Sequence, residues 1–311
     1  MQPHNLSLSS NSHKSLSVII KVCAVIPFFC LFLCCVIVML HIFASHRHFL
    51  ETSRYTLFAC MLVNDTLQLF FSVLLFLLSM GQVTLALVYC APLLFVSLVT
   101  FQNTPLILAA MSLERYVAIV YPLHQPAMWR SDRLWVMVLV LFILSCVFPI
   151  AMFSIRPLDP AEDILTTQHV CKNFNINSSP TQTLLKVGVH VSVFSLVAIV
   201  VLFTYVRILL ETRKLRHDRA SVGRAMHTVM LHAIQLLLCM LAFLYPITVN
   251  FIQLHGDWSK QDVAFFNYFC FMLIPRFLSP LIYGFRDQSL RGYIGKTFNC
   301  CFKKANLQVQ T

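Results

Sequence analysis

The stretch LVYCAPLLFVSLVTFQNTPLILAAMSLERYVAIVY, residues 87–121, decides the fold because it is apolar over nearly its whole length. Its only charged side chains are Glu114 and Arg115, which lie near its C-terminal end. A helix needs roughly 20 mostly apolar residues to cross the hydrocarbon core of a bilayer, and this stretch exceeds that length. It therefore predicts a membrane-spanning helix.

The same pattern recurs along the chain of 311 residues, 58% of which are hydrophobic and 11% charged. This composition is too apolar for a water-soluble globular domain. Seven stretches have spanning length: Leu16–Phe43, Tyr55–Met80, Leu87–Tyr121, Leu134–Phe153, Leu184–Leu210, Val222–Leu254 and Val263–Phe285. We predict an all-α bundle of seven transmembrane helices over residues 16–285, with an outer tail at 1–15 and a cytoplasmic amphipathic helix and tail at 286–311. The first stretch is too long for a cleaved signal-peptide core, so we expect a retained signal anchor.

Basic residues indicate the orientation, because Lys and Arg are retained on the cytoplasmic side during insertion. One set of alternate connections carries most cations, whereas the other mixes few cations with Asp159, Glu162, Asp163, Asp257 and Asp262. The cation-rich set comprises Arg47, Arg54, Arg130, Arg133, Arg207, Arg213, Lys214, Arg216, Arg219, Arg224, Arg286, Arg291, Lys296, Lys303 and Lys304. We expect a plasma-membrane protein with its N-terminus outside and its C-terminus in the cytoplasm. This bias and attraction to anionic membrane lipid account for the net charge of +11, so nucleic acid is a poor candidate partner.

Most of the 12 cysteines lie in predicted spans, where a cysteine is usually a small buried hydrophobe. Cys90, at the outer start of the third span, and Cys171, in the long outer loop before the fifth, lie in an oxidising compartment. A bridge between them would hold that loop over the mouth of the bundle. Modification is expected at two other kinds of site: glycosylation at the sequons that begin with Asn5 and Asn177, and palmitoylation at Cys300 and Cys301.

Charged side chains inside a membrane are costly and usually mark function. The sequence places Asp65, Glu114, Arg115 and Arg276 there. Glu114 and Arg115 can pair with each other at rest, and an arginine freed from that pair can reach the backbone carbonyls of a partner protein. For an isolated Glu-Arg, an interfacial ion pair with a snorkelling arginine is the alternative.

The sequence around this pair resembles a known signature. MSLERYVAIVYPL, residues 111–123, resembles that of class A (rhodopsin-like) G-protein-coupled receptors, in the version typical of odorant receptors. LVND at 62–65 resembles the second-helix aspartate motif of that class, Cys90 and Cys171 its outer disulfide pair, and SPLIY at 279–283 its Asn-Pro-x-x-Tyr motif. With PRFLSP at 275–280 and YGFRD at 283–287, the chain most resembles the divergent, fish-type odorant receptor 131 branch.

The resemblance implies roles for individual residues. Arg115, in the Glu114-Arg115-Tyr116 motif, would engage a heterotrimeric G protein of the olfactory or stimulatory type, with Glu114 as its resting partner. Tyr205 and Tyr283 would turn inward in the active state, and Pro280 would kink the seventh helix. The chain also departs from the family: the first helix lacks a Gly-Asn pair, Ser279 replaces Asn or Asp, and Phe243-Leu244-Tyr245-Pro246 replaces Cys-Trp-x-Pro. We take Tyr245 as the substitute for the missing tryptophan.

Arg276 is the most unusual departure, because it lies about one turn before Pro280, deep in the membrane. In the family, the aspartate that matches Asp65 often helps to bind a sodium ion. We hypothesise that Arg276 occupies that space as a built-in cation and pairs with Asp65. The alternative is that Arg276 turns toward a water-filled cavity or a backbone carbonyl.

A ligand site is expected among the outer halves of the third, fifth, sixth and seventh helices, since transmembrane bundles bind ligands between helices. The candidate lining residues are Ser97, Leu98, Phe101, Gln102, His190, Phe194, Tyr245, Val249, Phe266 and Phe269. They are mostly apolar and include no carboxylate, which favours a small, mostly neutral organic ligand over a monoamine. Simple helix packing is the alternative at each position. His190 has two possible roles: it recognises a carbonyl or carboxylate group of the ligand, or it forms a hydrogen bond with a neighbouring helix.

Other classes of membrane protein fit the sequence less well. A retinal-binding opsin needs a lysine in the seventh span, and Val263–Phe285 has none. A small-molecule transporter usually shows internal repeats or Gly-interrupted helices, whereas this chain has 7 glycines and no evident repeat. A membrane enzyme would need a catalytic or nucleotide motif, and none is evident. We therefore expect a receptor without catalytic residues, cofactor or metal; a non-olfactory class A chemoreceptor is the main alternative.

Overall fold

A computed structural model describes residues 3–122, 129, 131–155, 168–171, 180–214, 230, 234, 237–238, 260–286 and 290–295. The helices are α1 (Pro3–Ser45), α2 (Arg47–Glu51), α3 (Ser53–Met80), α4 (Leu87–Val120), α6 (Ser131–Ser154), α7 (Pro180–Lys214) and α10 (Lys260–Asn267). α10 continues through a π-helical turn, η2 (Tyr268–Leu273), into α11 (Ile274–Arg286). Residues 290–295 are also helical. Two short strands, β1 (Thr84–Ala86) and β2 (Gln168–Val170), pair antiparallel.

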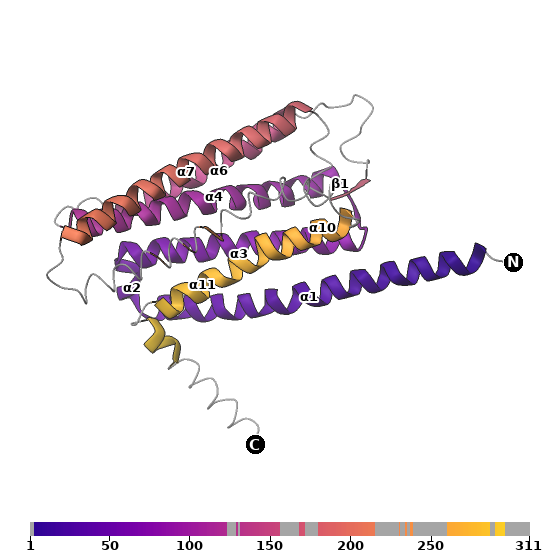
Figure 1. Cartoon of the computed structure of the whole chain (residues 1–311), viewed down its shortest axis with the longest axis horizontal. Helices are drawn as coiled ribbons and strands as arrows, with labels where there is room; N and C mark the ends of the chain where they lie inside the picture. The colour runs from indigo at the N-terminus through magenta and orange to yellow at the C-terminus, as the bar shows by residue number, and fades with distance from the viewer. Residues whose placement is uncertain are drawn as a thin grey trace, which may run out of the picture.

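The long helices lie side by side along a common axis, as Figure 1 shows. α4 packs against α3, α6 and α7, while α1 and α11 pack against each other and against α3. The two strands lie at one end of the bundle, and the short α2 lies at the other (Figure 1). α3 and α4 are therefore the central pair around which the other described helices gather.

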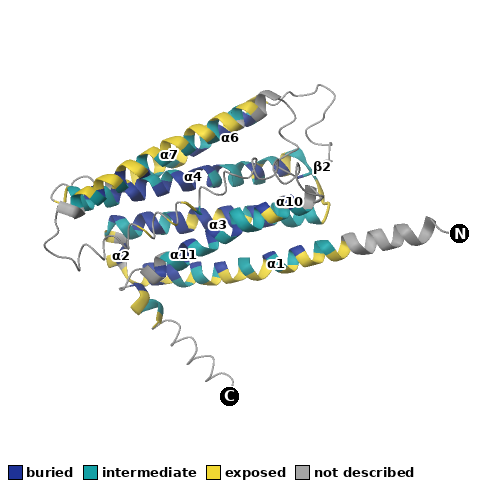
Figure 2. Cartoon of the chain, viewed as in Figure 1, coloured by how far each residue is buried: buried dark blue, intermediate teal, exposed yellow. Residues whose placement is uncertain are grey.

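The distribution of polar and apolar side chains identifies the solvent as lipid. Large apolar side chains line the outside, for example Ile37 at 64% and Leu202 at 65% exposure, and Figure 2 shows such exposed faces along α1, α6 and α7. Polar side chains such as Asn64, Asp65 and Gln68 are instead buried between helices. Six helices in the described part of the chain are long and apolar enough to cross a bilayer. The chain is a multi-pass membrane protein.

The observed helices agree with the predicted spans over the described residues, and α1 extends beyond its predicted start. α1 begins at Pro3, so residues 3–15 continue the first helix instead of preceding it; proline suits the first helical position, and no Gly or Pro interrupts the next residues. The predicted sixth span, Val222–Leu254, lies almost entirely outside the described residues. The seventh span is helical from Lys260 to Arg286 and contains the π-turn.

Candidate functional site

A chain of hydrogen bonds crosses the membrane interior from α6 to α11. The Ser145 hydroxyl donates to Asn103 Oδ1 (3.2 Å), and Asn103 Nδ2 donates to Asn64 Oδ1 (3.0 Å). Asn64 Nδ2 donates to Thr104 Oγ1 (2.9 Å), which donates to Asp65 Oδ1 (3.1 Å). Each group donates to the next, so the dipoles reinforce one another and point toward the carboxylate. In lipid, buried polar groups need such internal partners.

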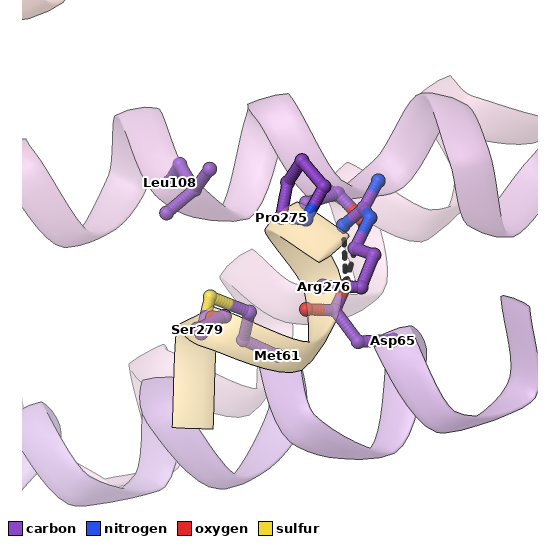
Figure 3. A pocket seen from close by; sticks show the side chains of 7 residues that line it. Met61, Asp65, Leu108, Pro275, Arg276 and Ser279 are labelled. Atoms are coloured by element: carbon purple, nitrogen blue, oxygen red, sulfur yellow. Dashed lines mark hydrogen bonds and ion pairs between the residues drawn. The ribbon is translucent and has the colours of Figure 1, made fainter. Parts of the chain in front are cut away.

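This hydrogen-bond chain ends at a buried ion pair. Arg276 Nη1 donates to Asp65 Oδ1 at 2.5 Å, and the residues are 4% and 1% exposed. Figure 3 shows the guanidinium of Arg276 on α11 reaching across to Asp65 on α3. The predicted pairing is thus present, and the alternative orientations of Arg276 are not adopted.

The space beside the ion pair is small. Its lining residues are Met61, Asp65, Thr104, Leu108, Pro275, Arg276 and Ser279 (Figure 3), and it offers about 10 Å³, enough for about one water molecule. Ser279 and Pro280 follow Arg276 on α11 and are both buried. The guanidinium already supplies a positive charge beside the carboxylate of Asp65.

A second ion pair lies near the C-terminal end of α4. Arg115 Nε is 3.4 Å from Glu114 Oε2, and the hydroxyl of Ser53 donates to Glu114 Oε1 at 3.1 Å. Glu114 is 2% exposed, so both of its oxygens have partners away from water. Ser53 is the first residue of α3, and the bond therefore ties α3 to α4 at this end.

Aromatic residues lie in the region next to Glu114 and Arg115. The ring of Tyr116 is 5.9 Å from that of Tyr121 and 5.8 Å from that of Phe203 on α7. Tyr121 also lies beside Arg207. Tyr205 is partly buried against the core, whereas the side chain of Tyr283 lies outside the described residues.

At the other end of the bundle, a disulfide joins Cys90 at the start of α4 to Cys171 just after β2. The Cα atoms are 5.7 Å apart, and β1 pairs with β2 from Thr84 opposite Val170 to Ala86 opposite Gln168. Leu94 is buried beside the two half-cystines. This end of the loop is therefore held against α4, as the sequence predicts.

The candidate lining residues on α4 and α7 come together in part. The His190 ring lies 5.9 Å from that of Phe101 and 5.3 Å from that of Phe148 on α6. Gln102 is 3% exposed, and neither atom of its carboxamide has a hydrogen-bond partner in the described part of the chain. Ser97 and Leu98 are half-buried one turn away, and Phe194 packs against the core.

On the seventh helix, Phe269 packs against Phe28 of α1 at 5.2 Å and against Phe265 at 5.8 Å. Phe266 is 41% exposed and contacts Phe271. Phe269 therefore packs on the side of the seventh helix that faces α1. Tyr245 and Val249 lie outside those residues, as do Asn177, Cys300, Cys301 and the side chain of Asn5.

Comparison with known proteins decides the family. The sequence model described as 7 transmembrane receptor (rhodopsin family) matches residues 34–283, most of the chain. The chain belongs to this family. The zebrafish (Danio rerio) protein Odorant receptor 131-2 is 28% identical to the receptor over 187 residues, which are 60% of this chain and 57% of that protein. The receptor thus spans over half the length of this relative, and the resemblance to the odorant receptor 131 branch is confirmed.

The features that sequence reasoning missed include the ion pair of Lys21 and the hydrogen-bond chain. Lys21, in the first predicted span, is 7% exposed; its Nζ lies 2.5 Å from Asp262 of α10 and 5.9 Å from the ring centre of Phe265. A single lysine in an otherwise apolar span was the available signal. The hydrogen-bond chain was the other omission, because its members are ordinary residues whose spacing alone does not reveal contacts between helices.

Proposed function

We propose that the receptor binds a small, mostly neutral, odorant-like organic molecule between the outer halves of its helices and activates a heterotrimeric G protein of the olfactory or stimulatory type. The N-terminus then lies outside the plasma membrane, and the Glu114–Arg115 end faces the cytoplasm. This orientation follows from the excess of Lys and Arg in the connections on that side.

The Glu114–Arg115 pair is the observation that carries this proposal. Glu114 binds Arg115 through one oxygen and Ser53 through the other, which ties the inner ends of α3 and α4 together. A guanidinium released from this pair presents several donors that suit the carbonyl groups at the end of a partner helix. Family membership supports the same role, because G-protein activation is general in this receptor family.

The chemistry of the outer half supports a neutral ligand. His190 contacts the rings of Phe101 and Phe148, and the buried amide of Gln102 supplies an NH2 donor group and a carbonyl acceptor. Asp262, which would attract an amine, is paired with Lys21. An apolar site with few hydrogen-bonding groups favours a small organic molecule that carries at most one carbonyl or hydroxyl group.

A sodium ion has no role in this proposal. Arg276 supplies the positive charge that Asp65 needs, and the adjoining cavity has room for about one water molecule. We propose that the tethered guanidinium replaces a diffusible cation, which makes the resting state independent of sodium.

The test is cyclic AMP output from cells that express the receptor, measured across a panel of small odorants and acids. The wild type should respond to at least one compound, and Arg115→Ala should abolish the response at equal surface expression. Arg133→Ala is the matched control, because it removes the same charge from the inner end of α6 and should leave the response intact. Equal responses from wild type and Arg115→Ala would contradict the proposal.

A further inference from the structure

Two polar bonds join the described part of the seventh helix to α3, one at the first residue of the π-turn and one beyond its last residue. Asp65 accepts from Arg276 of α11, and the hydroxyls of Ser72 and Tyr268 share a hydrogen bond of 3.3 Å. Tyr268 is the first residue of η2, whereas Arg276 follows its last residue by three positions. The π-turn therefore lies between the two points at which the helix is attached to α3.

Helix geometry explains why a π-turn is needed there. On α3, Asp65 and Ser72 are seven positions apart, so at about 100° per residue they lie within about 20° of each other on one face. Tyr268 and Arg276 are eight positions apart, which in a continuous α-helix would set them about 80° apart around the axis. A π-turn holds about one extra residue and removes about 100° of that rotation. Both side chains can then face α3 together.

The two bonds and the π-turn are consequently linked. If Tyr268–Leu273 became α-helical, one end of the seventh helix would rotate by about 100° relative to the other. Either Tyr268 would leave Ser72 or Arg276 would leave Asp65. The ion pair is buried and joined to the hydrogen-bond chain, so without a ligand the neutral Ser72–Tyr268 bond is the one that breaks.

The face of α3 between the two bonds is incompletely satisfied. Gln68 lies between Asp65 and Ser72 on this face, is 0% exposed, and has no hydrogen-bond partner for either atom of its carboxamide in the described part of the chain. A buried amide without partners destabilises the arrangement that contains it. This amide therefore lowers the stability of the resting contact beside the π-turn.

We propose that the π-turn Tyr268–Leu273 can change between a π-helical and an α-helical register. This change couples the aromatic outer end of the seventh helix to the Asp65–Arg276 ion pair. Tyr268 stacks on Phe76 at 5.2 Å, and Phe269 contacts Phe28 and Phe265. A ligand that fixes these rings holds the outer end, so a change to the α-register must then rotate α11 and draw Arg276 away from Asp65. This regulatory role rests on the proposed receptor function, but the register itself does not.

The first test uses thermal unfolding of the purified receptor without ligand or G protein. In the wild-type background, Ser72→Ala and Tyr268→Phe should each lower the melting temperature. The shift of the double variant should differ from the sum of the two single shifts by roughly 2–4 °C, because the two residues share one hydrogen bond. Deletion of Cys270, which removes one residue from the π-turn, should abolish this coupling. Cys270→Ala, which keeps the residue count, should retain it.

Persistence of the coupling in the deletion variant would overturn the proposal. If that variant does not fold, hydrogen exchange of the full receptor provides the test. Ser72→Ala should slow amide exchange over residues 268–273, because the turn becomes α-helical. Unchanged exchange would overturn the proposal. In cells, the deletion should lose a ligand response that Cys270→Ala retains. Because the first two measurements need no signalling, failure of the register is distinguishable from failure of the proposed function.

Discussion

Breaking the Asp65–Arg276 ion pair from one side should destabilise the receptor strongly. Arg276→Met keeps the approximate length of the side chain but leaves the carboxylate of Asp65, which is 1% exposed, without its cation. Removing one partner of a buried pair costs about 3–5 kcal/mol, because the other charge remains buried. Thr104 still donates to Asp65, so the expected loss lies toward the lower end of this range.

The double variant Asp65→Asn/Arg276→Met separates stranded charge from lost packing. Replacing both members of a buried pair by neutral groups of similar size is often about neutral in free energy. The double variant should therefore regain most of the stability that Arg276→Met loses. Arg133→Met, near the start of α6, should stay within about 0.5 kcal/mol of the wild type. Thermal and denaturant unfolding of the purified receptor measure these differences. A double variant less stable than Arg276→Met would refute this reasoning.

Three further predictions concern the other described ion pairs and the sodium proposal. Exchanging sodium for a large organic cation should leave agonist potency and basal output of the wild type unchanged; a several-fold shift in potency would contradict the replacement of sodium by Arg276. Ser53→Ala should raise basal cyclic AMP output, because Glu114 loses a hydrogen bond worth about 1.5–3 kcal/mol near the C-terminal end of α4. Thr66→Val on the same helix as Ser53 should not raise it. Asp262→Asn should lower the free energy of unfolding by about 3 kcal/mol, because it leaves the buried Lys21 without its counter-charge. Lys21→Met should lower it by about 1 kcal/mol, because the side chain of Asp262 is 42% exposed and can be hydrated. Equal losses in the two variants would show that Lys21 is not buried.

Much of the fold was predictable because lipid imposes a simple rule on the sequence. A spanning helix must be apolar and long enough to cross the bilayer, so residues 87–121 and the other spans stand out by composition alone. The start of α1 was not predicted, since Ser and Asn residues near the N-terminus favour neither lipid nor a definite end to the helix. The π-turn was also missed, because it depends on the contacts of Tyr268 and Arg276 with α3 rather than on a local motif.

The candidate site was predictable where charge made residues conspicuous. Asp65 and Arg276 had to find each other because each is costly in the membrane without a counter-charge. Ser53, Asn103 and Ser145 were not identified, since an uncharged polar residue can bond to its own helix backbone or to another helix, and sequence spacing does not distinguish the two. The ligand-lining residues remain predictions, as do the roles of Arg115, Tyr205 and Tyr283 in activation.

Nucleotide exchange on a purified heterotrimeric G protein tests the central claim most directly. The receptor, reconstituted in lipid nanodiscs together with a compound that raises cyclic AMP output in cells, would be assayed for GTP uptake by the G protein. Wild type, Arg115→Ala and the control Arg133→Ala would be compared at equal concentrations. The wild type and the control should accelerate uptake over the G protein alone, and Arg115→Ala should not. Equal acceleration by all three would show that Arg115 is not the contact, and no acceleration by the wild type with any stimulatory, inhibitory or other G protein would contradict the receptor function itself.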